Sequence, residues 1–148
     1  MFKDYVEKIR NAHVYDVAKK TPLEPAPGLT TRLNNRVLLK REDLQPVFSF
    51  KLRGAYNKIS QLDEAQRKKG VIAASAGNHA QGVALAAQRL GLDALIVMPK
   101  TTPDIKVHAV ESLGGEVILH GNAYDDAYDH AMEVAKDLGM TYIPPYDD

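Results

Sequence analysis

A loose repeat runs through the second half of the chain, in which a helical stretch ends in glycine and an apolar run follows within one or two residues. The four units are marked by Gly70, Gly91, Gly114 and Gly139, which are 21, 23 and 25 residues apart. Glycine is favoured just after a helix because the backbone there is often left-handed. Each interval holds a strand, a turn and a helix of three turns or more. The repeat therefore predicts successive βα units.

The apolar runs in this repeat are continuous and do not alternate with polar residues. They cover residues 71–75, 94–98, 117–119 and 141–143. Continuous apolar runs are typical of strands that are buried on both faces. The segments between them have apolar residues at a spacing near 3.6, as amphipathic helices do. We therefore expect an α/β fold, with an open parallel sheet of about four strands wound right-handed and with helices on both faces.

The chain before residue 69 does not repeat this unit. Residues 3–10 have the spacing of an amphipathic helix, and residues 21–30 are proline-rich and are expected to be extended. A short strand is expected at residues 37–40, and residues 50–61 are expected to form a helix that joins the parallel sheet. This first part therefore belongs to a different layer or to another domain.

Composition narrows the class of protein. The 148 residues are 45% hydrophobic, which suits a globular domain with a substantial core. Lys+Arg and Asp+Glu both number 19, so no sustained positive field supports a nucleic-acid partner. No apolar run approaches the roughly 20 residues that cross a bilayer. Zero cysteines exclude disulfides and thiolate metal sites. Because the start of the chain resembles neither a signal nor a transit peptide, we expect a cytoplasmic protein.

A lysine at the start of an expected helix is the first candidate for chemistry. Lys51 becomes a nucleophile toward carbonyls only if burial or positive charge lowers its pKa. Phe48 and Phe50 are candidates for an apolar wall around it, and Arg53 and the helix N-terminus would disfavour an added proton. Gly54 would permit close approach of a backbone or a ligand. A lysine between aromatic residues is more often a solvated surface residue, so both interpretations remain open at this point.

A second candidate site follows the first parallel strand. Ser75, Ala76, Gly77, Asn78 and His79 lie between that strand and a helix, where open α/β sheets bind ligands. Free N–H groups at a helix start favour a carboxylate or a phosphate, and the Asn78 amide can donate to a phenolate-like oxygen. Ser and Asn are also common helix caps, and a histidine there is more often packed or solvated than catalytic.

No metal site is expected from the remaining histidines. His13, His108, His120 and His130 are expected to be isolated from one another, at spacings that build no metal cluster. Nucleotide-binding patterns are also missing, because no Lys-Ser/Thr pair follows Gly82 and no G-x-G-x-x-G occurs.

Two motifs together resemble a known family. Residues 40–56 and 75–82 are similar to biosynthetic threonine ammonia-lyase (threonine dehydratase), one of the tryptophan-synthase-β-like, fold type II pyridoxal-phosphate enzymes. The similarity runs through nearly the whole chain and includes residues 14–17, 21–23, 94–99 and 104–106, and 114–117 through to 144–145. Either motif alone would also admit serine racemase and other relatives.

The resemblance implies a role for each matching residue. Lys51 would form the Schiff base with pyridoxal 5′-phosphate and then remove the α-proton of threonine, leading to 2-oxobutanoate and ammonia. Phe50 would lie beside the cofactor ring, and Asn78 would bind its 3′ oxygen. The segment of Ser75, Ala76, Gly77, Asn78 and His79 would hold the substrate carboxylate.

The resemblance also implies a longer protein. In the family, a glycine-rich phosphate loop and the group that faces the pyridine nitrogen follow the region matched here. We therefore expect residues 1–50 to be an N-terminal segment of the larger domain and residues 51–148 to be the smaller α/β domain. The second half of the larger domain and the regulatory domain would be absent. Such a fragment is expected to bind pyridoxal phosphate weakly and to turn over little threonine alone.

Other functions remain open from the sequence. The chain is also compatible with a non-catalytic interaction module that buries an exposed sheet edge in a partner or in a second copy, giving a homo-oligomer. A serine racemase or serine dehydratase relative is a further alternative, with serine in place of threonine as substrate.

Overall fold

The computed structural model describes residues 2–147, so residues 1 and 148, the outer ends of the two expected domains, lie outside the described residues. Its main sheet has four strands in the order β5-β4-β3-β6, and each neighbouring pair is parallel. The strands are β3 (Val71–Ala74), β4 (Ala94–Met98), β5 (Glu116–Leu119) and β6 (Thr141–Tyr142). The expected open parallel α/β sheet is confirmed.

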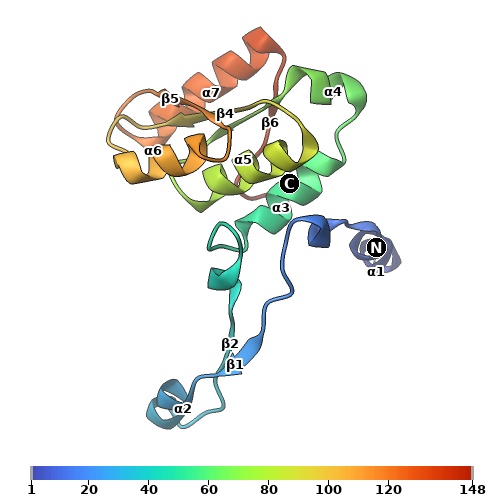
Figure 1. Ribbon diagram of the computed structural model, residues 1–148, viewed down its shortest axis with the longest axis vertical. Helices are drawn as coiled ribbons and strands as arrows, with labels where there is room; N and C mark the ends of the chain where they lie inside the picture. Colours follow the sequence, from blue (N-terminus) through green and yellow to red (C-terminus); the bar gives the residue numbers. More distant parts are fainter. Residues whose placement is uncertain (1, 148) are drawn as a thin grey trace.

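Helices cover both faces of this sheet (Figure 1). One face packs on α5 (Asn78–Leu90), α3 (Lys51–Ser60) and α6 (Asp104–Glu111), and the other packs on α7 (Tyr124–Leu138). Because side chains alternate across a strand, Val71 and Ala73 join the α5 cluster, whereas Ile72 and Ala74 join the α7 cluster. Both faces of β3 and β4 are therefore buried under helices, as their continuous apolar runs predict.

The repeated glycines have the predicted backbone conformation. Gly70, Gly91, Gly114 and Gly139 have φ angles of 79°, 69°, 81° and 67°. This left-handed region costs little only without a Cβ atom. Gly91 and Gly139 directly end α5 and α7, and Gly70 ends α4 (Glu64–Lys69).

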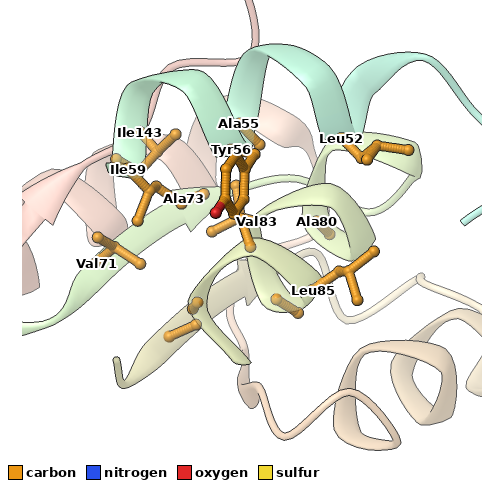
Figure 2. Packing of buried hydrophobic residues seen from close by; sticks show 14 of the residues in the cluster. Leu52, Ala55, Tyr56, Ile59, Val71, Ala73, Ala80, Val83, Leu85 and Ile143 are labelled. Atoms are coloured by element: carbon orange, nitrogen blue, oxygen red, sulfur yellow. The ribbon is translucent and has the colours of Figure 1, made fainter. Parts of the chain in front are cut away.

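Helix α3 lies against α5 and extends the core beyond the sheet. Leu52 and Ile59 of α3 are fully buried and pack with Val83 of α5 and with Ile143, which follows β6 (Figure 2). Burial of a side chain of this size contributes about 1.5–3 kcal/mol to folding. The same packing holds the first turn of α3, which carries Lys51, beside the start of α5.

The N-terminal part forms α1 (Phe2–Asn11) and then an arm that projects from the body (Figure 1). The arm contains β1 (Leu23–Pro25), α2 (Pro27–Leu33) and β2 (Leu38–Lys40), and β1 pairs antiparallel with β2. The expectation that residues 21–30 are extended is wrong for residues 27–30. Pro27 suits the first position of a helix, where a missing N–H costs nothing, so a proline-rich run was compatible with a helix start.

Among the described residues, no helix is both long enough and apolar enough to cross a membrane.

Candidate active site

The two sequence motifs meet at the carboxyl end of β3. A cavity of about 440 Å³ lies there, within the range of small-ligand sites. Its walls come from the start of α3, the segment that joins β3 to α5, the start of α7 and the segment after β6. The lining residues are Ser49, Phe50, Lys51, Ala74, Ser75, Ala76, Asn78, His79, Tyr124, Pro145 and Tyr146. Every predicted site residue except Gly77 therefore lines one cavity, and Gly77 lies directly before α5.

Lys51 is the first residue of α3, and its backbone N–H donates to the hydroxyl of the buried Ser49 at 3.2 Å. The Lys51 ammonium donates to the carbonyl of Pro145, 94 residues further along the chain. It also lies 5.9 Å from the centre of the Phe50 ring. A second cavity, of about 370 Å³, opens on another side of the Lys51 side chain, between α3 and residues 143–147. Lys51 thus lines both cavities, and within residues 2–147 its ammonium has the Pro145 carbonyl as its hydrogen-bond acceptor.

Four expected neighbours of Lys51 differ from the prediction in whole or in part. Phe48 and Phe50 are 77% and 59% exposed, so they do not enclose the lysine within residues 2–147. The Arg53 guanidinium donates to the Glu42 carboxylate at 2.8 Å, and this bond lowers the pKa of Glu42 to about 2. An arginine that is paired in this way adds little positive charge beside Lys51. An added Cβ at Gly54 would meet nothing within 4 Å, so no backbone approaches closely there, and Gly54 instead lines the second cavity.

The close approach occurs instead at Gly82 of α5. A Cβ there would lie 3.2 Å from the Leu52 Cα, the Leu52 nitrogen and the Lys51 carbonyl carbon. Glycine at this position therefore lets α5 touch the backbone of α3 directly beside Lys51.

The start of α5 combines a side-chain acceptor with free backbone donors. The Ser75 hydroxyl accepts from the N–H groups of Gly77 and Ala80, both at 3.3 Å. The first N–H groups of a helix have no partner inside it, and those of Asn78 and His79 fall in this position. The Asn78 side chain is exposed to the cavity. This arrangement can bind a carboxylate or a phosphate through backbone donors and a neutral oxygen through the Asn78 amide.

His79 is buried, and its imidazole is turned away from this role. Its Nε2 lies 2.9 Å from the carbonyl oxygen of Ile143, and because a carbonyl only accepts, Nε2 carries the proton. Burial lowers the pKa of His79 despite this hydrogen bond, and the nearby charge of Lys51 adds to the effect. The imidazole therefore ties the start of α5 to the segment that supplies the Pro145 carbonyl, and only the backbone N–H of His79 remains for an anion.

This burial predicts a pH dependence of stability. The unfolded chain protonates His79 near the ordinary histidine pKa of about 6.5, whereas the folded chain resists protonation until a lower pH. His79 therefore does not affect stability well above the ordinary pKa of about 6.5. Stability is lost as the pH falls from there toward the lower pKa of His79 in the folded chain. We expect His79→Gln, whose amide can still donate to Ile143, to lose less stability than the wild type between pH about 7.5 and about 5.5. Urea unfolding at both pH values measures this difference.

The matched control is His108→Gln, because His108 is exposed on α6. This variant should keep the pH dependence of the wild type. An equal loss of stability in His79→Gln and in the wild type would contradict the assignment of this pH dependence to His79.

Some features of the cavity were not found from the sequence. Pro145 and Tyr146 reach it because β6 pairs with β3, and a strand order of this kind is not encoded in any local pattern. The apolar strand followed by Pro144-Pro145 was the available signal. Tyr124 reaches the cavity from α7, and no motif marked it.

The remaining histidines include one pair that the sequence spacing did not predict. His120 and His130 stack with ring centres 4.0 Å apart, so the expectation that they are isolated from each other is wrong. Within residues 2–147, no group of three or more His, Cys, Asp or Glu side chains is placed to hold a metal ion.

Fold and site together define a class of protein. A parallel α/β sheet carries, at the carboxyl ends of its strands, a lysine that faces a helix start able to bind anions. This is the arrangement of an enzyme that holds a small anionic cofactor or substrate beside a nucleophilic amine.

The comparisons with known proteins identify the family. The model of the pyridoxal-phosphate dependent enzyme family matches residues 14–148, and the chain belongs to that family. It is 59% identical over 144 residues to threonine dehydratase 1 biosynthetic, chloroplastic, of tomato (Solanum lycopersicum). The matched region covers 97% of this chain and 24% of the relative. The chain thus spans about a quarter of that relative's length.

Solved structures agree with this assignment. The processed form of threonine deaminase isoform 2 from tomato superposes with a TM-score of 0.94 at 56% identity, covering 98% of this chain and 40% of that one. Maize serine racemase superposes with a TM-score of 0.90 at 32% identity, covering 97% and 44%. The fold type II class expected from the sequence is confirmed.

Proposed function

We propose that this chain forms the lysine-bearing part of a threonine dehydratase, which converts L-threonine to 2-oxobutanoate and ammonia. The observation that carries the proposal is the single cavity shared by Lys51, Asn78 and the start of α5. The high identity to the tomato dehydratase supports threonine as the substrate.

The residues of the cavity fit the aldehyde, the phenolic oxygen and the ring of pyridoxal 5′-phosphate. Lys51 offers an amine for the aldehyde, Asn78 offers an amide donor for the phenolic oxygen, and Phe50 offers an aromatic face. When bound, the cofactor supplies an electron sink for the negative charge that develops at the α-carbon of an amino acid.

Residues of the chain itself bind the amino acid, accept its proton and position the acceptor. The free N–H groups at the start of α5 bind the carboxylate of the amino acid and fix its orientation. The Lys51 Nζ, as a neutral amine, takes the proton from the α-carbon, and the Pro145 carbonyl accepts a hydrogen bond from the resulting ammonium. His79 keeps Pro145 in place through Ile143.

Two related activities are less well supported. A serine racemase role has a fold match but a sequence identity of only 32%, against 56% for threonine deaminase. Serine differs from threonine by one methyl group, so it remains a candidate as a second substrate of the same site.

The division into domains is part of the proposal. Residues 1–50 belong to the larger domain and residues 51–148 to the smaller one. In support, the arm carries leucines that lack cover within residues 2–147, and Leu23 and Leu33 are 59% and 60% exposed. An additional part of the larger domain would cover them, in agreement with relatives about four times as long. Because the arm leucines equally suit self-association, a homo-oligomer and a non-catalytic interaction role are the competing explanations of this surface.

We further propose a cytoplasmic enzyme that supplies 2-oxobutanoate for isoleucine biosynthesis. The word biosynthetic in the name of the tomato relative supports the pathway. That relative is named chloroplastic, so its name does not support the cytoplasmic location, which is proposed for this chain alone.

A chimera tests the proposed function. Residues 1–148 replace the matched segment of the tomato dehydratase, and release of 2-oxobutanoate from L-threonine is measured with pyridoxal 5′-phosphate present. We expect the chimera to deaminate threonine and the chain alone to release little product, because the relatives use a much longer chain. A chimera that binds the cofactor but deaminates only serine, or neither amino acid, would contradict the proposal.

A further inference from the structure

The wall of the cavity that comes from α7 consists of one side chain, that of Tyr124. This residue opens α7, and its side chain is 40% exposed. Ala127, one turn further along α7, is buried in the cluster that contains Ala74. Residues three apart lie on the same face of a helix, so Tyr124 lies over the end of β3, beside the segment that starts at Ser75.

The backbone that precedes Tyr124 is firmly held. The Asp126 carboxylate accepts from the N–H groups of Asn122 at 2.8 Å and Ala123 at 3.0 Å, and these bonds lower the pKa of Asp126. The carbonyl of Gly121 accepts from the N–H of Lys100 at 2.9 Å, which ties this turn to the segment after β4.

The Tyr124 ring is also supported by its neighbours. It stacks on Tyr128 with ring centres 6.2 Å apart, and Tyr128 meets the Tyr142 ring edge-on at 5.6 Å. Such aromatic pairs contribute geometry as well as burial. Tyr128 and Tyr142 therefore support the Tyr124 ring from behind, and Tyr124 alone of the three lines the cavity.

The cavity has polar groups as well as apolar ones. The ammonium of Lys51, the Asn78 amide and the N–H groups of α5 suit the charged groups of an amino acid. The Tyr124 ring comes from a different element, at the end of β3. An amino acid bound by its carboxylate at the start of α5 has its side chain left for this surface.

We propose that Tyr124 is a specificity-determining residue, whose ring packs against the side chain of the bound amino acid and favours a methyl group beyond the β-carbon. This inference rests on the proposed function, because it takes an amino acid as the ligand of the cavity. The ring and not the hydroxyl carries the effect, since the contact is apolar.

The experiment compares L-2-aminobutanoate with L-alanine, which differ by one methylene and lack the hydroxyl that is eliminated from threonine. Both are titrated into the isotopically labelled chain with pyridoxal 5′-phosphate, and the backbone amide signals of residues 75–79 are followed by NMR. Burial of one methylene predicts about fourfold tighter binding of L-2-aminobutanoate by the wild type. Tyr124→Ala should reduce this ratio to about one, and Tyr124→Phe should keep it.

Tyr5→Ala is the control variant, because Tyr5 is exposed on α1. In the wild type, an NOE between the methyl group of L-2-aminobutanoate and the Tyr124 ring provides a readout that does not depend on a variant folding. Amide shifts without this NOE, together with an unchanged ratio in Tyr124→Ala, would overturn the role of Tyr124 and leave the proposed function standing. No amide shift with either amino acid would overturn the role of Tyr124, and threonine turnover by the chimera then decides the proposed function separately.

Discussion

Lys51→Ala is expected to abolish the absorbance band that pyridoxal 5′-phosphate gains when it binds the chain. Among the described residues that line the cavity, Lys51 is the one lysine. In the chimera with the tomato dehydratase, the same change should lower threonine turnover by roughly 10²–10⁴-fold from the loss of proton transfer alone. Absorbance titration with the cofactor and 2-oxobutanoate release measure the two effects.

Lys106→Ala is the matched control for this prediction. Lys106 also lies in the first turn of a helix, α6, and is exposed. The Lys106→Ala variant should bind the cofactor, and in the chimera it should turn over threonine, as the wild type does. If Lys51→Ala retained the absorbance band, the role of Lys51 would be wrong, whatever its effect on turnover.

Gly82→Val is expected to lower the free energy of unfolding by about 1–3 kcal/mol, the usual cost of overpacking a core. Even a Cβ at this position comes within 3.2 Å of the backbone at Lys51 and Leu52. A valine must push α3 away from α5, and it should weaken cofactor binding because Lys51 moves with α3. Urea unfolding followed by circular dichroism, together with cofactor titration, measures both results.

Gly54→Ala provides the opposite expectation within the same pair of helices. Nothing lies within 4 Å of a Cβ at Gly54, which is in the interior of α3. Alanine should therefore raise the free energy of unfolding by about 0.5–1 kcal/mol. Equal stability of Gly82→Val and the wild type would show that α5 does not need its close contact with α3.

The sheet was predictable from the sequence because its signals are local. Each strand contains an apolar run, and each of the helices α4 to α7 ends near a glycine such as Gly91 or Gly139, whose positive φ angle costs little without a Cβ atom. The helix start after β3 was predictable for the same reason. These features depend on neighbours within a few residues, which a sequence displays directly.

The environment of Lys51 was less predictable, because it depends on contacts between distant residues. Arg53 pairs with Glu42, and Lys51 reaches Pro145 only because β6 lies beside β3. Local sequence does not state which charges pair or which strands adjoin. Phe48 and Phe50 are apolar, but their exposure depends on what covers them, so residue type alone did not indicate it.

The central claim is that Lys51 is the amine that holds the cofactor, and chemical trapping tests it most directly. The chain is mixed with pyridoxal 5′-phosphate, reduced with borohydride and digested, and the labelled peptides are identified by mass spectrometry. The structure predicts a reduced cofactor adduct on the peptide that contains Lys51, at a higher yield than on the exposed Lys106. Labelling of Lys106 and other exposed lysines with Lys51 left unmodified would contradict it.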